Sequence, residues 1–388
     1  MKKTFCFKLY NTKHNRSLHR QINAAGLIYN HCIALHKRFY RLYGKYLDKN
    51  KLQKHLVKLK HKEKFSYICE IGSQAVQDIT DRIDRAYKLF RRNSEHKIKS
   101  SPPNFKKVKR YKSFTLKQVG WKLNEETGRT IIGKKCYRYF KSRNVEGKIK
   151  TVTVKRDAVG DLYIYLVCDI QNGQVKPRTG KSVGLDFGLK TFLTASDGND
   201  IISPDFFMQN VRIIRKKSCN LSRKKEDSRN RERARRELAR IYRKLGNQRK
   251  DFHFKTARKL CNEYACICLE TLNTKGMAKL WGRKIHSLGF FSFVKILEYE
   301  AMKLGTRVIF VPQYFPSSQL CHVCGYKNEA VKDLKVREWE CPCCHTRHNR
   351  DRNAALNIFS AGTSAVSGDT VRPEKPGSVV DAEIPCIR

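Results

Sequence analysis

The sequence predicts a multidomain protein of mixed class, with an α/β part and a β-rich part. Its 388 residues are enough for two or three domains. In the first half, two helical segments with periodic apolar residues precede several β-rich segments that are separated by glycines. In the second half, short apolar strands alternate with helical segments, which is typical of an α/β sheet.

The first hundred residues predict one strand and a small helical module. Residues 4–10 alternate between apolar and polar side chains, as a strand does. Residues 18–46 and 73–92 each place their apolar side chains on one helical face. Residues 48–64 are rich in Lys and His and fit either a helix or a loop. Residues 93–112 contain two adjacent prolines and predict a linker or an ordered loop.

Residues 113–170 predict a small antiparallel sheet or barrel, because several β-rich segments follow one another with glycines between them. The strand at residues 4–10 could join this sheet, in which case the helices form an insertion. Residues 171–181 predict a second linker.

The second half predicts strands that build an α/β sheet. Residues 182–198 predict a hairpin whose first strand ends at Asp186 and whose tight turn contains Gly188. Residues 264–269 and 306–311 predict two more buried strands.

The segments between and after these strands are mostly helical in pattern. Residues 212–259 contain 20 Lys or Arg against 5 Asp or Glu. A solvated helical hairpin would explain them, but the charge density favours a helix pair that follows the backbone of a nucleic-acid duplex. Residues 291–304 predict a helix capped by Gly305, and residues 277–284 predict a loop or short turn. Beyond Gly362 the tail is rich in Gly, Ser and Pro and predicts disorder.

The charge of the chain indicates a polyanionic partner. Lys and Arg number 82 and Asp and Glu 35, which gives a net charge of +47. Nucleic acid is the expected partner, since such an excess destabilises a compact chain unless a polyanion neutralises it. A membrane surface is disfavoured, because the sequence has neither a run of about 18 apolar residues nor an apolar signal segment at its start. Fifteen cysteines without an export signal predict reduced thiols in a cytosol.

Four cysteines predict a zinc site. Cys321 and Cys324 form one CxxC pair, and Cys341 and Cys344 form a second pair after sixteen intervening residues. This spacing matches a four-thiolate zinc knuckle. The zinc is expected to be structural, since thiolates fill all four positions and leave none open.

Three residues near the second pair are given other interpretations. Cys343 lies inside the pair and is interpreted as a bystander. His345 and His348 could replace a ligand, but the favoured interpretation is that they face nucleic acid or are merely solvated.

Three carboxylates occupy marked positions and predict a magnesium site. Asp186 and Glu270 each end an apolar strand, and Asp351 opens an apolar-periodic helix. Helix capping alone could explain Asp351. However, α/β sheets place their chemistry at strand ends, and converging carboxylates would repel one another unless divalent cations joined them. Two Mg²⁺ ions about 3.5–4 Å apart would support phosphodiester hydrolysis by water. Taken together, the residues predict a zinc-containing, metal-dependent hydrolase of nucleic acid.

The same stretches resemble the TnpB family, which many bacterial insertion sequences encode. The first RuvC motif of that family resembles GLDFGLKTFLTASDG, the second resembles ICLETLNTKGM, and the zinc ribbon and third motif resemble the two CxxC pairs followed by HNRDRNAALNI. The basic segment LSRKKEDSRNRERARRELARIYRKLGNQRKDF also resembles the family pattern. The chain departs from it at Cys343 and at His345, where a glycine is usual.

The resemblance implies an RNA-guided DNA endonuclease, similar to ancestors of type V CRISPR effectors. Such a protein binds a guide RNA from the transposon end, recognises a short motif flanking a double-stranded DNA target, and cuts both strands with one RuvC site. Base pairing then supplies the sequence specificity. On this basis Asp186, Glu270 and Asp351 are the catalytic magnesium ligands.

The resemblance also implies a domain plan with an RNase H-like, RuvC-type nuclease domain and a barrel-like wedge domain. The expected boundaries are 1–12 and 104–178 for the wedge, 13–103 for a helical recognition insertion, 179–319 and 346–361 for the nuclease, 320–345 for the ribbon, and 362–388 for a disordered tail. A monomer is favoured, and the resemblance implies a bacterial or archaeal cytosol, in association with the nucleoid.

Two other functions stay open at this point. One is a catalytically silent, RNA-guided DNA-binding repressor, and the other is a resolvase or transposase for branched DNA that needs no RNA. Candidate contacts to nucleic acid are basic residues of segment 212–259: Arg223, Lys224, Lys225, Arg229, Arg235, Arg236, Arg243 and Lys244.

Overall fold

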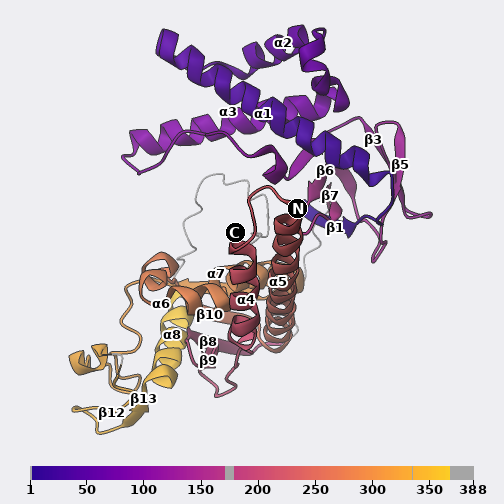
Figure 1. Ribbon diagram of the computed structural model, residues 1–388. Helices are drawn as coiled ribbons and strands as arrows, with labels where there is room; N and C mark the ends of the chain where they lie inside the picture. Colours follow the sequence, from indigo (N-terminus) through magenta and orange to yellow (C-terminus); the bar gives the residue numbers. More distant parts are fainter. Residues whose placement is uncertain (1, 171–178, 334, 368–388) are drawn as a thin grey trace. The chain divides into compact units, whose positions relative to one another are not determined.

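The computed structural model describes residues 2–170, 179–333 and 335–367 (Figure 1). The chain divides into two compact units, Met1–Asn172 and Gly173–Arg388. Each unit has its own hydrophobic core. The predicted linker therefore lies at the boundary of the two units, although its residues 171–178 are outside the described part of the chain.

The first unit is built on an open antiparallel sheet of four strands. Its strand order is β1-β7-β6-β2. The strands are β1 (Lys2–Lys8), β2 (Ser113–Leu116), β6 (Lys148–Arg156) and β7 (Leu162–Asp169). β1 pairs with β7, so the predicted association of the first strand with the later ones is confirmed. The helices between β1 and β2 are therefore an insertion in this sheet.

A second antiparallel sheet contains β3 (Trp121–Asn124), β4 (Arg129–Ile132) and β5 (Lys135–Arg138). The sequence pattern did not predict β3 and β5, which have four residues each. A bridge between Leu9 and Tyr139 links this sheet to the end of β1. The described strands of the first unit thus form two sheets joined by this bridge, and the barrel-like wedge stays a prediction.

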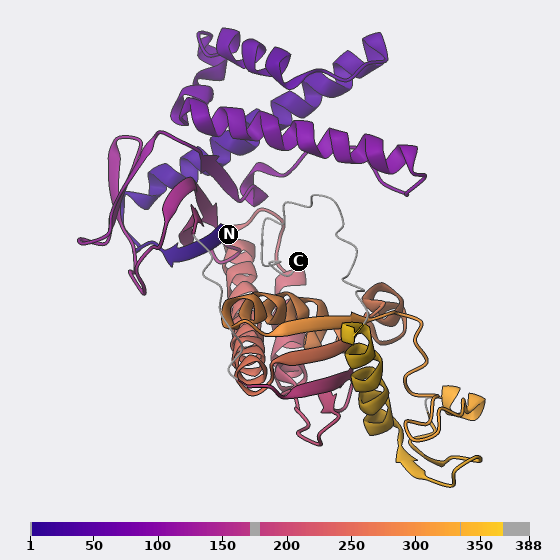
Figure 2. The same ribbon diagram turned by 180° about the vertical axis from the view of Figure 1, so that it is seen from behind.

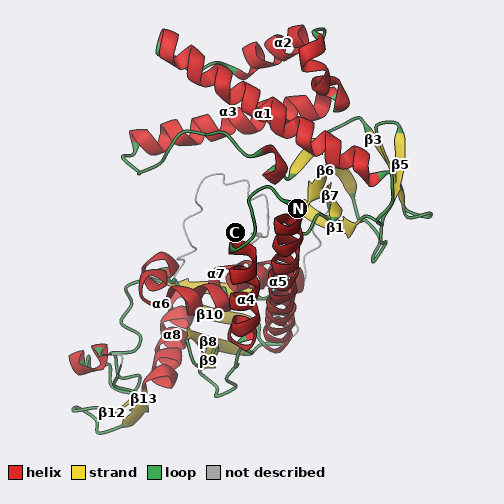
Figure 3. Cartoon of the chain, in the orientation of Figure 1, coloured by secondary structure: helices red, strands yellow, loops and turns green. Residues whose placement is uncertain are grey.

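The helical insertion packs on the four-stranded sheet and shares its core. It comprises α1 (Asn15–Tyr43), α2 (Lys49–Leu59), the 3₁₀ segments η1 (Glu63–Glu70) and η2 (Val108–Arg110), and α3 (Ser73–Glu95) (Figure 3). The ambiguous segment 48–64 contains α2, which begins because the side chain of Asp48 accepts a hydrogen bond from the backbone of Asn50. α1 ends at Gly44, whose positive φ suits glycine.

The second unit contains a four-stranded sheet with the order β11-β10-β8-β9. The strands β8 (Ser182–Phe187), β10 (Cys266–Glu270) and β11 (Arg307–Val311) are parallel, and β9 (Leu193–Ala195) runs antiparallel to β8. The predicted tight turn at Gly188 is confirmed, because a Cβ there would lie 2.5 Å from the carbonyl oxygen of Thr191. The predicted α/β sheet is thus present.

Helices cover both faces of this sheet. Alternate side chains of β8 and β10, such as Leu185 and Leu269, pack with α5 (Arg229–Glu263) and α7 (Phe290–Leu304). The intervening side chains face α8 (Arg350–Ser367), which lies along the sheet (Figure 2). α4 (Phe206–Ser222) packs against α5, so the predicted helical hairpin forms.

Two expectations about the second unit are wrong. Residues 277–284, predicted as a loop, lie in α6 (Thr274–Leu288). Two glycines weaken its helical pattern, but Asn273 caps its start, Gly289 ends it, and Ile285 and Leu288 anchor it in the core. The predicted tail also begins too early, because α8 continues to Ser367. Residues 368–388 are outside the described part of the chain.

The predicted cap of α7 is confirmed, since Gly305 has a φ of 78° and its N–H donates to the carbonyl of Ala301. Among the helices that the structure describes, none is long and apolar enough to cross a membrane.

Candidate functional site

α8 lies directly on the backbone of two strands because small residues allow a close approach. A Cβ on Gly184 of β8 would lie 2.3 Å from the carbonyl oxygen of Ala355. A Cβ on Gly362 of α8 would lie 2.3 Å from Sγ of Cys268 on β10. The helix therefore runs over β8 and β10 with its first turn at the carboxyl ends of these strands.

Three carboxylates meet at this edge of the sheet. Asp186 follows Gly184 by two residues, and Glu270 follows Cys268 by two, so both side chains share the sheet face that α8 covers. Leu185 pairs with Leu269, which places the two acids at equivalent positions on neighbouring parallel strands. Asp351 lies in the first turn of α8.

The charges of the three carboxylates interact. Burial raises the pKa of Asp186 well above its usual value, and the charges of Glu270 and Asp351 raise it further. Burial also raises the pKa of Glu270 to about 7. A cluster of this kind favours a divalent cation, because the cation replaces both the lost hydration and the mutual repulsion.

Two arginines that the sequence pattern did not single out flank the cluster. Arg337 donates to both oxygens of Asp351, at 3.2 and 3.3 Å. Arg350 is buried, donates to the carbonyl of Asp333 at 3.1 Å, and lowers the pKa of Asp186 by its charge. Arg350 could have been found because it precedes Asp351 in the sequence, whereas Arg337 lies fourteen residues away and gave no such signal.

The four predicted zinc ligands also come together. The sulfur atoms of Cys321, Cys324, Cys341 and Cys344 all lie within 4.8 Å of one another. The shortest separations are 3.6 Å between Cys321 and Cys344 and 3.5 Å between Cys324 and Cys341. Hydrogen bonds from Thr346 lower the pKa of Cys344 to about 6, which favours the thiolate that zinc binds. The donor set therefore fits a structural zinc ion.

The neighbours of the cysteines differ in their roles. Cys343 is exposed and lies outside the cluster, as predicted. His345 is exposed too. The favoured interpretation of His348 is wrong: it is only 4% exposed, and its Nε2 lies 3.1 Å from Sγ of Cys321. The imidazole can therefore donate to the thiolate and orient it.

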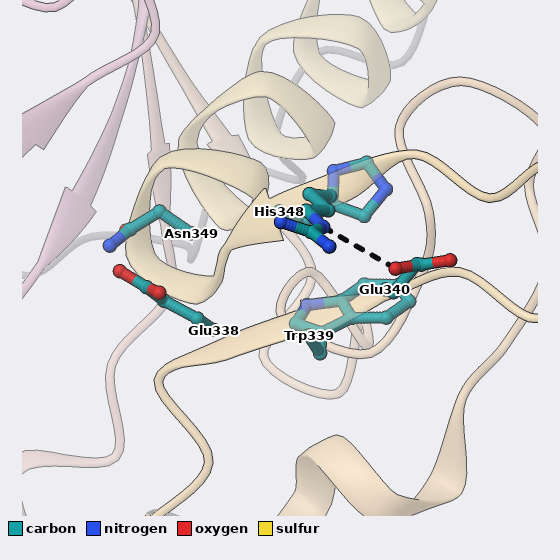
Figure 4. A pocket seen from close by; sticks show the side chains of 6 residues that line it. Glu338, Trp339, Glu340, His348 and Asn349 are labelled. Atoms are coloured by element: carbon teal, nitrogen blue, oxygen red, sulfur yellow. Dashed lines mark hydrogen bonds and ion pairs between the residues drawn. The ribbon is translucent and has the colours of Figure 1, made fainter.

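His348 lies on a short hairpin of β12 (Glu338–Glu340) and β13 (Arg347–Asn349). Its ring packs against Trp339, with 4.6 Å between ring centroids (Figure 4). Charged and polar side chains of the hairpin line a shallow hollow of about 360 Å³ there, and Arg347 pairs with Glu340 across the strands. The hairpin leads directly into α8 and hence to Asp351.

Amide side chains of α8 tie the ribbon to the helix. Asn353 accepts a hydrogen bond from the backbone of His322 and donates to the carbonyl of Leu320. Asn357 donates to the carbonyls of Ser317 and Leu320. These bonds fix the chain just before Cys321, so the position of the ribbon and that of Asp351 are coupled.

The predicted nucleic-acid contacts lie on the α4–α5 hairpin. Two of these residues pair with Glu232, Arg235 at 2.7 Å and Arg236 at 2.9 Å. Both arginines lower the pKa of Glu232, to about 2. Five of the eight are exposed and three are partly buried: exposed are Arg223, Lys225, Arg229, Arg236 and Lys244, and partly buried are Lys224, Arg235 and Arg243. No single one of them is distinguished by its geometry.

Fold and site together define a class: a mixed α/β protein in which a four-cysteine cluster that fits a zinc ribbon is joined to three carboxylates whose charges interact. Comparison with known families gives two matches. Residues 165–280 match the family OrfB_IS605, described as "Probable transposase". Residues 290–358 match "Cas12f1-like, TNB domain".

Relatives extend this similarity to nearly the whole chain. A Streptomyces pristinaespiralis protein named "Putative RNA-guided DNA endonuclease" is 28% identical, over 97% of this chain and 94% of its own. The Escherichia coli K12 protein "Putative RNA-guided DNA endonuclease InsQ" is 27% identical, over 92% of each chain.

A viral relative and a solved structure agree with these matches. "TnpB-like protein L79" of Acanthamoeba polyphaga mimivirus is 30% identical, over 55% of this chain and 43% of its own. The fold is similar to that in "Cryo-EM structure of the Cas12f1-sgRNA-target DNA complex", with a TM-score of 0.56, 15% identity, and coverage of 90% of this chain and 83% of that one. The two family matches and these relatives agree that the chain is similar to TnpB-like proteins and to proteins named as putative RNA-guided DNA endonucleases.

Proposed function

We propose that this chain is an RNA-guided DNA endonuclease of a transposon, which cleaves target DNA next to a short flanking motif by Mg²⁺-dependent hydrolysis. The observation that carries the proposal is the convergence of Asp186, Glu270 and Asp351 at one edge of the sheet. The names of the relatives and the guide RNA and target DNA in the similar Cas12f1 complex support the guided reaction.

The carboxylates would hold the catalytic cations. Burial raises the pKa of both Glu270 and Asp186, and a bound cation would offset that loss of hydration, so the donor set suits hard divalent ions such as Mg²⁺. Bound there, Mg²⁺ would supply Lewis acidity for the attack of water on the phosphodiester.

The protein's own groups then have separable tasks. The register of β8 and β10 fixes Asp186 beside Glu270, and the close packing of α8 on Gly184 brings Asp351 to them. Arg350 adds a positive charge near Asp186, where the substrate phosphate would also be attracted. The basic α4–α5 hairpin would bind nucleic-acid backbone without reading its sequence.

The finer architecture belongs to the same proposal. The second unit would be a RuvC-type, RNase H-like nuclease domain at 179–319 and 346–367, carrying the zinc ribbon at 320–345. The first unit would supply the wedge and the helical recognition insertion. The four-strand sheet flanked by helices and the sheet with inserted helices support this plan.

The test is an Asp186→Asn variant, which removes one carboxylate charge and nearly conserves shape. Cleavage of a plasmid that carries the target should fall by more than about a hundredfold, since even groups that only orient a metal ligand contribute 10–100-fold. Binding of guide RNA and target DNA should persist. Asp251→Asn is the matched control, because Asp251 is an exposed residue of α5 paired with Lys255.

Three outcomes would contradict the proposal in different ways. Equal cleavage by Asp186→Asn would exclude the carboxylate site. Guided binding by the wild type without cleavage would indicate a silent repressor. Cleavage of branched DNA by protein without RNA would indicate a resolvase.

A further inference from the structure

The C-terminal half of α1 presents aromatic side chains to solvent. Tyr40 is 48% exposed and Tyr43 is 62% exposed. Residues three apart on a helix are neighbours on its surface, so the two phenol rings share one face. Single exposed aromatic residues are common, but adjacent exposed aromatic residues often mark a binding surface.

An inner layer of aromatic rings supports this surface. Tyr40 stacks on Tyr46, with 4.8 Å between centroids and 27° between planes, and Tyr46 contacts Tyr87 of α3 at 5.2 Å. Phe39 packs against Tyr43 at 4.7 Å. The exposed rings are thereby held in place before any partner binds, which lowers the entropy cost of binding.

The charge around the rings is predominantly positive. Residues 37–47 of the α1 end and residues 85–92 of α3 each contain four Lys or Arg and no Asp or Glu. The guanidinium of Arg91 lies 5.5 Å from the centroid of Tyr46, so the two segments meet at the aromatic cluster. Lys88 pairs with Asp84 one turn earlier on α3.

This combination selects among possible partners. A second copy of the chain would bring the same positive charge and be repelled. A polyanion is attracted, and nucleic acid also supplies flat rings that stack on aromatic side chains. Paired bases are enclosed in a duplex, so the bases that stack here must be unpaired.

We propose that Tyr40 and Tyr43 form a stacking platform for unpaired bases of the guide RNA, with the surrounding Lys and Arg binding its phosphates. The identity of the RNA rests on the proposed function, in which the DNA enters as a duplex whereas a folded RNA exposes unpaired loop bases. The inference adds a site on the helical insertion for the RNA itself.

The experiment compares full-length variants for binding of the transposon-end RNA at several salt concentrations. Tyr40→Ala/Tyr43→Ala should weaken binding by at least about tenfold, because each stacked base contributes that much or more. The salt dependence should be unchanged, since every Lys and Arg that binds phosphate is kept. Tyr40→Phe/Tyr43→Phe should bind within about twofold of the wild type because it keeps both rings.

A charge variant separates stacking from phosphate binding. Arg38→Gln/Arg41→Gln should reduce the slope of log affinity against log salt by about one for each phosphate that is no longer neutralised. Circular dichroism would show whether each variant is folded. Where the Ala pair unfolds, Tyr40→Leu/Tyr43→Leu replaces it, because leucine removes both rings but keeps apolar volume, and unchanged RNA binding by that pair overturns the platform.

The outcomes distinguish this inference from the proposed function. Wild-type RNA binding with no loss in the Ala pair overturns the platform and leaves the function standing. Absence of RNA binding by the wild type overturns both. Loss of binding to a single-stranded DNA oligonucleotide, with RNA binding intact, overturns the assignment to RNA. A change only in self-association shows that the surface joins two copies instead.

Discussion

At the scale of single residues, the position of each acid explains its chemistry. An Asp or Glu at the end of a buried strand is costly unless a charge or a ligand compensates it. Asp186 and Glu270 both lie at such strand ends, and burial raises the pKa of each. The cost is consistent with a site that is complete only when a cation is bound.

Magnesium affinity should therefore depend on pH. Glu270 must lose its proton to bind a cation, and its pKa is about 7 in the metal-free protein. We expect the affinity at pH 6 to be lower than at pH 8 by about tenfold or more, as measured by calorimetry with proton release on binding. The Asp251→Asn variant should show the same dependence, and equal affinities at both pH values would contradict the prediction.

In the metal-free protein, Glu270 should make stability fall as the pH rises, whereas most acids make stability rise with pH. The folded protein holds a proton on Glu270 that the unfolded chain releases near its ordinary value of 4.5. Raising the pH from 4.5 to 7 thus removes stability from the metal-free protein. Mg²⁺ should restore it above pH 7.

A second residue-scale prediction concerns the two zinc knuckles. The residue after each CxxC pair has a positive φ: 76° at Gly325 and 56° at His345. Glycine adopts this conformation without steric cost, whereas other residues pay about 1–2 kcal/mol. We expect His345→Gly to slow zinc release to a chelator, by up to about fivefold, and Gly325→Ala to accelerate it.

Each variant serves as the control for the other, because the two make opposite changes at equivalent positions and should shift the rate of zinc release in opposite directions. His345 also forms a long pair with Glu340 at 3.6 Å, but both groups are exposed and the pair contributes little. Faster zinc release from His345→Gly would show that this histidine holds the knuckle in some other way.

At the scale of elements, the ribbon and α8 act as one structure. The hairpin of β12 and β13 leads into α8, and Asn353 and Asn357 bind the chain before Cys321. His348 connects the hairpin to the sulfur of Cys321. Disorder in the ribbon should therefore reach Asp351.

Loss of zinc should lower both stability and cleavage. For Cys321→Ser we expect a melting temperature at least about 5 °C lower, since 1 kcal/mol corresponds to about 2–4 °C in a unit of this size. Cleavage should fall because the first turn of α8 loses its support. Cys343→Ser is the matched control, because Cys343 lies outside the cluster and should keep the full zinc content. Unchanged melting of Cys321→Ser would refute a structural zinc ion.

At the scale of the whole molecule, each unit contains a buried neutral histidine. His36 in the first unit is 2% exposed and stacks on Tyr87 at 4.5 Å. His253 in the second unit lies 2.9 Å from the carbonyl oxygen of Leu288. Burial lowers the pKa of each to about 4.

Both units should lose stability in acid. The unfolded chain takes up a proton near pH 6.5, which the folded histidine does not accept until about pH 4. Each histidine should therefore cost about 2 kcal/mol at pH 5 relative to pH 7.5. His36→Phe should reduce the loss of melting temperature in the first unit, and the exposed control His96→Phe should leave it unchanged.

The sequence by itself determined the elements and the chemical groups. Periodicity found α1, α3, α7 and the main strands, because amphipathic patterns are local. The two CxxC pairs predicted four thiols that could bind zinc, and the structure brings these four together, because their spacing suffices to form the knuckles. The strand ends identified Asp186 and Glu270, and the helix start identified Asp351.

Only the tertiary structure decided how these groups meet. The register of β8 with β10 and the approach of α8 at Gly184 and Gly362 depend on packing between segments far apart in sequence. Packing between distant segments also brings Arg337 to Asp351 and the ring of His348 to the sulfur of Cys321. It likewise forms the aromatic surface on α1, where Tyr40 stacks on Tyr46. Helix α6 escaped prediction because packing in the core, rather than its own propensity, stabilises it.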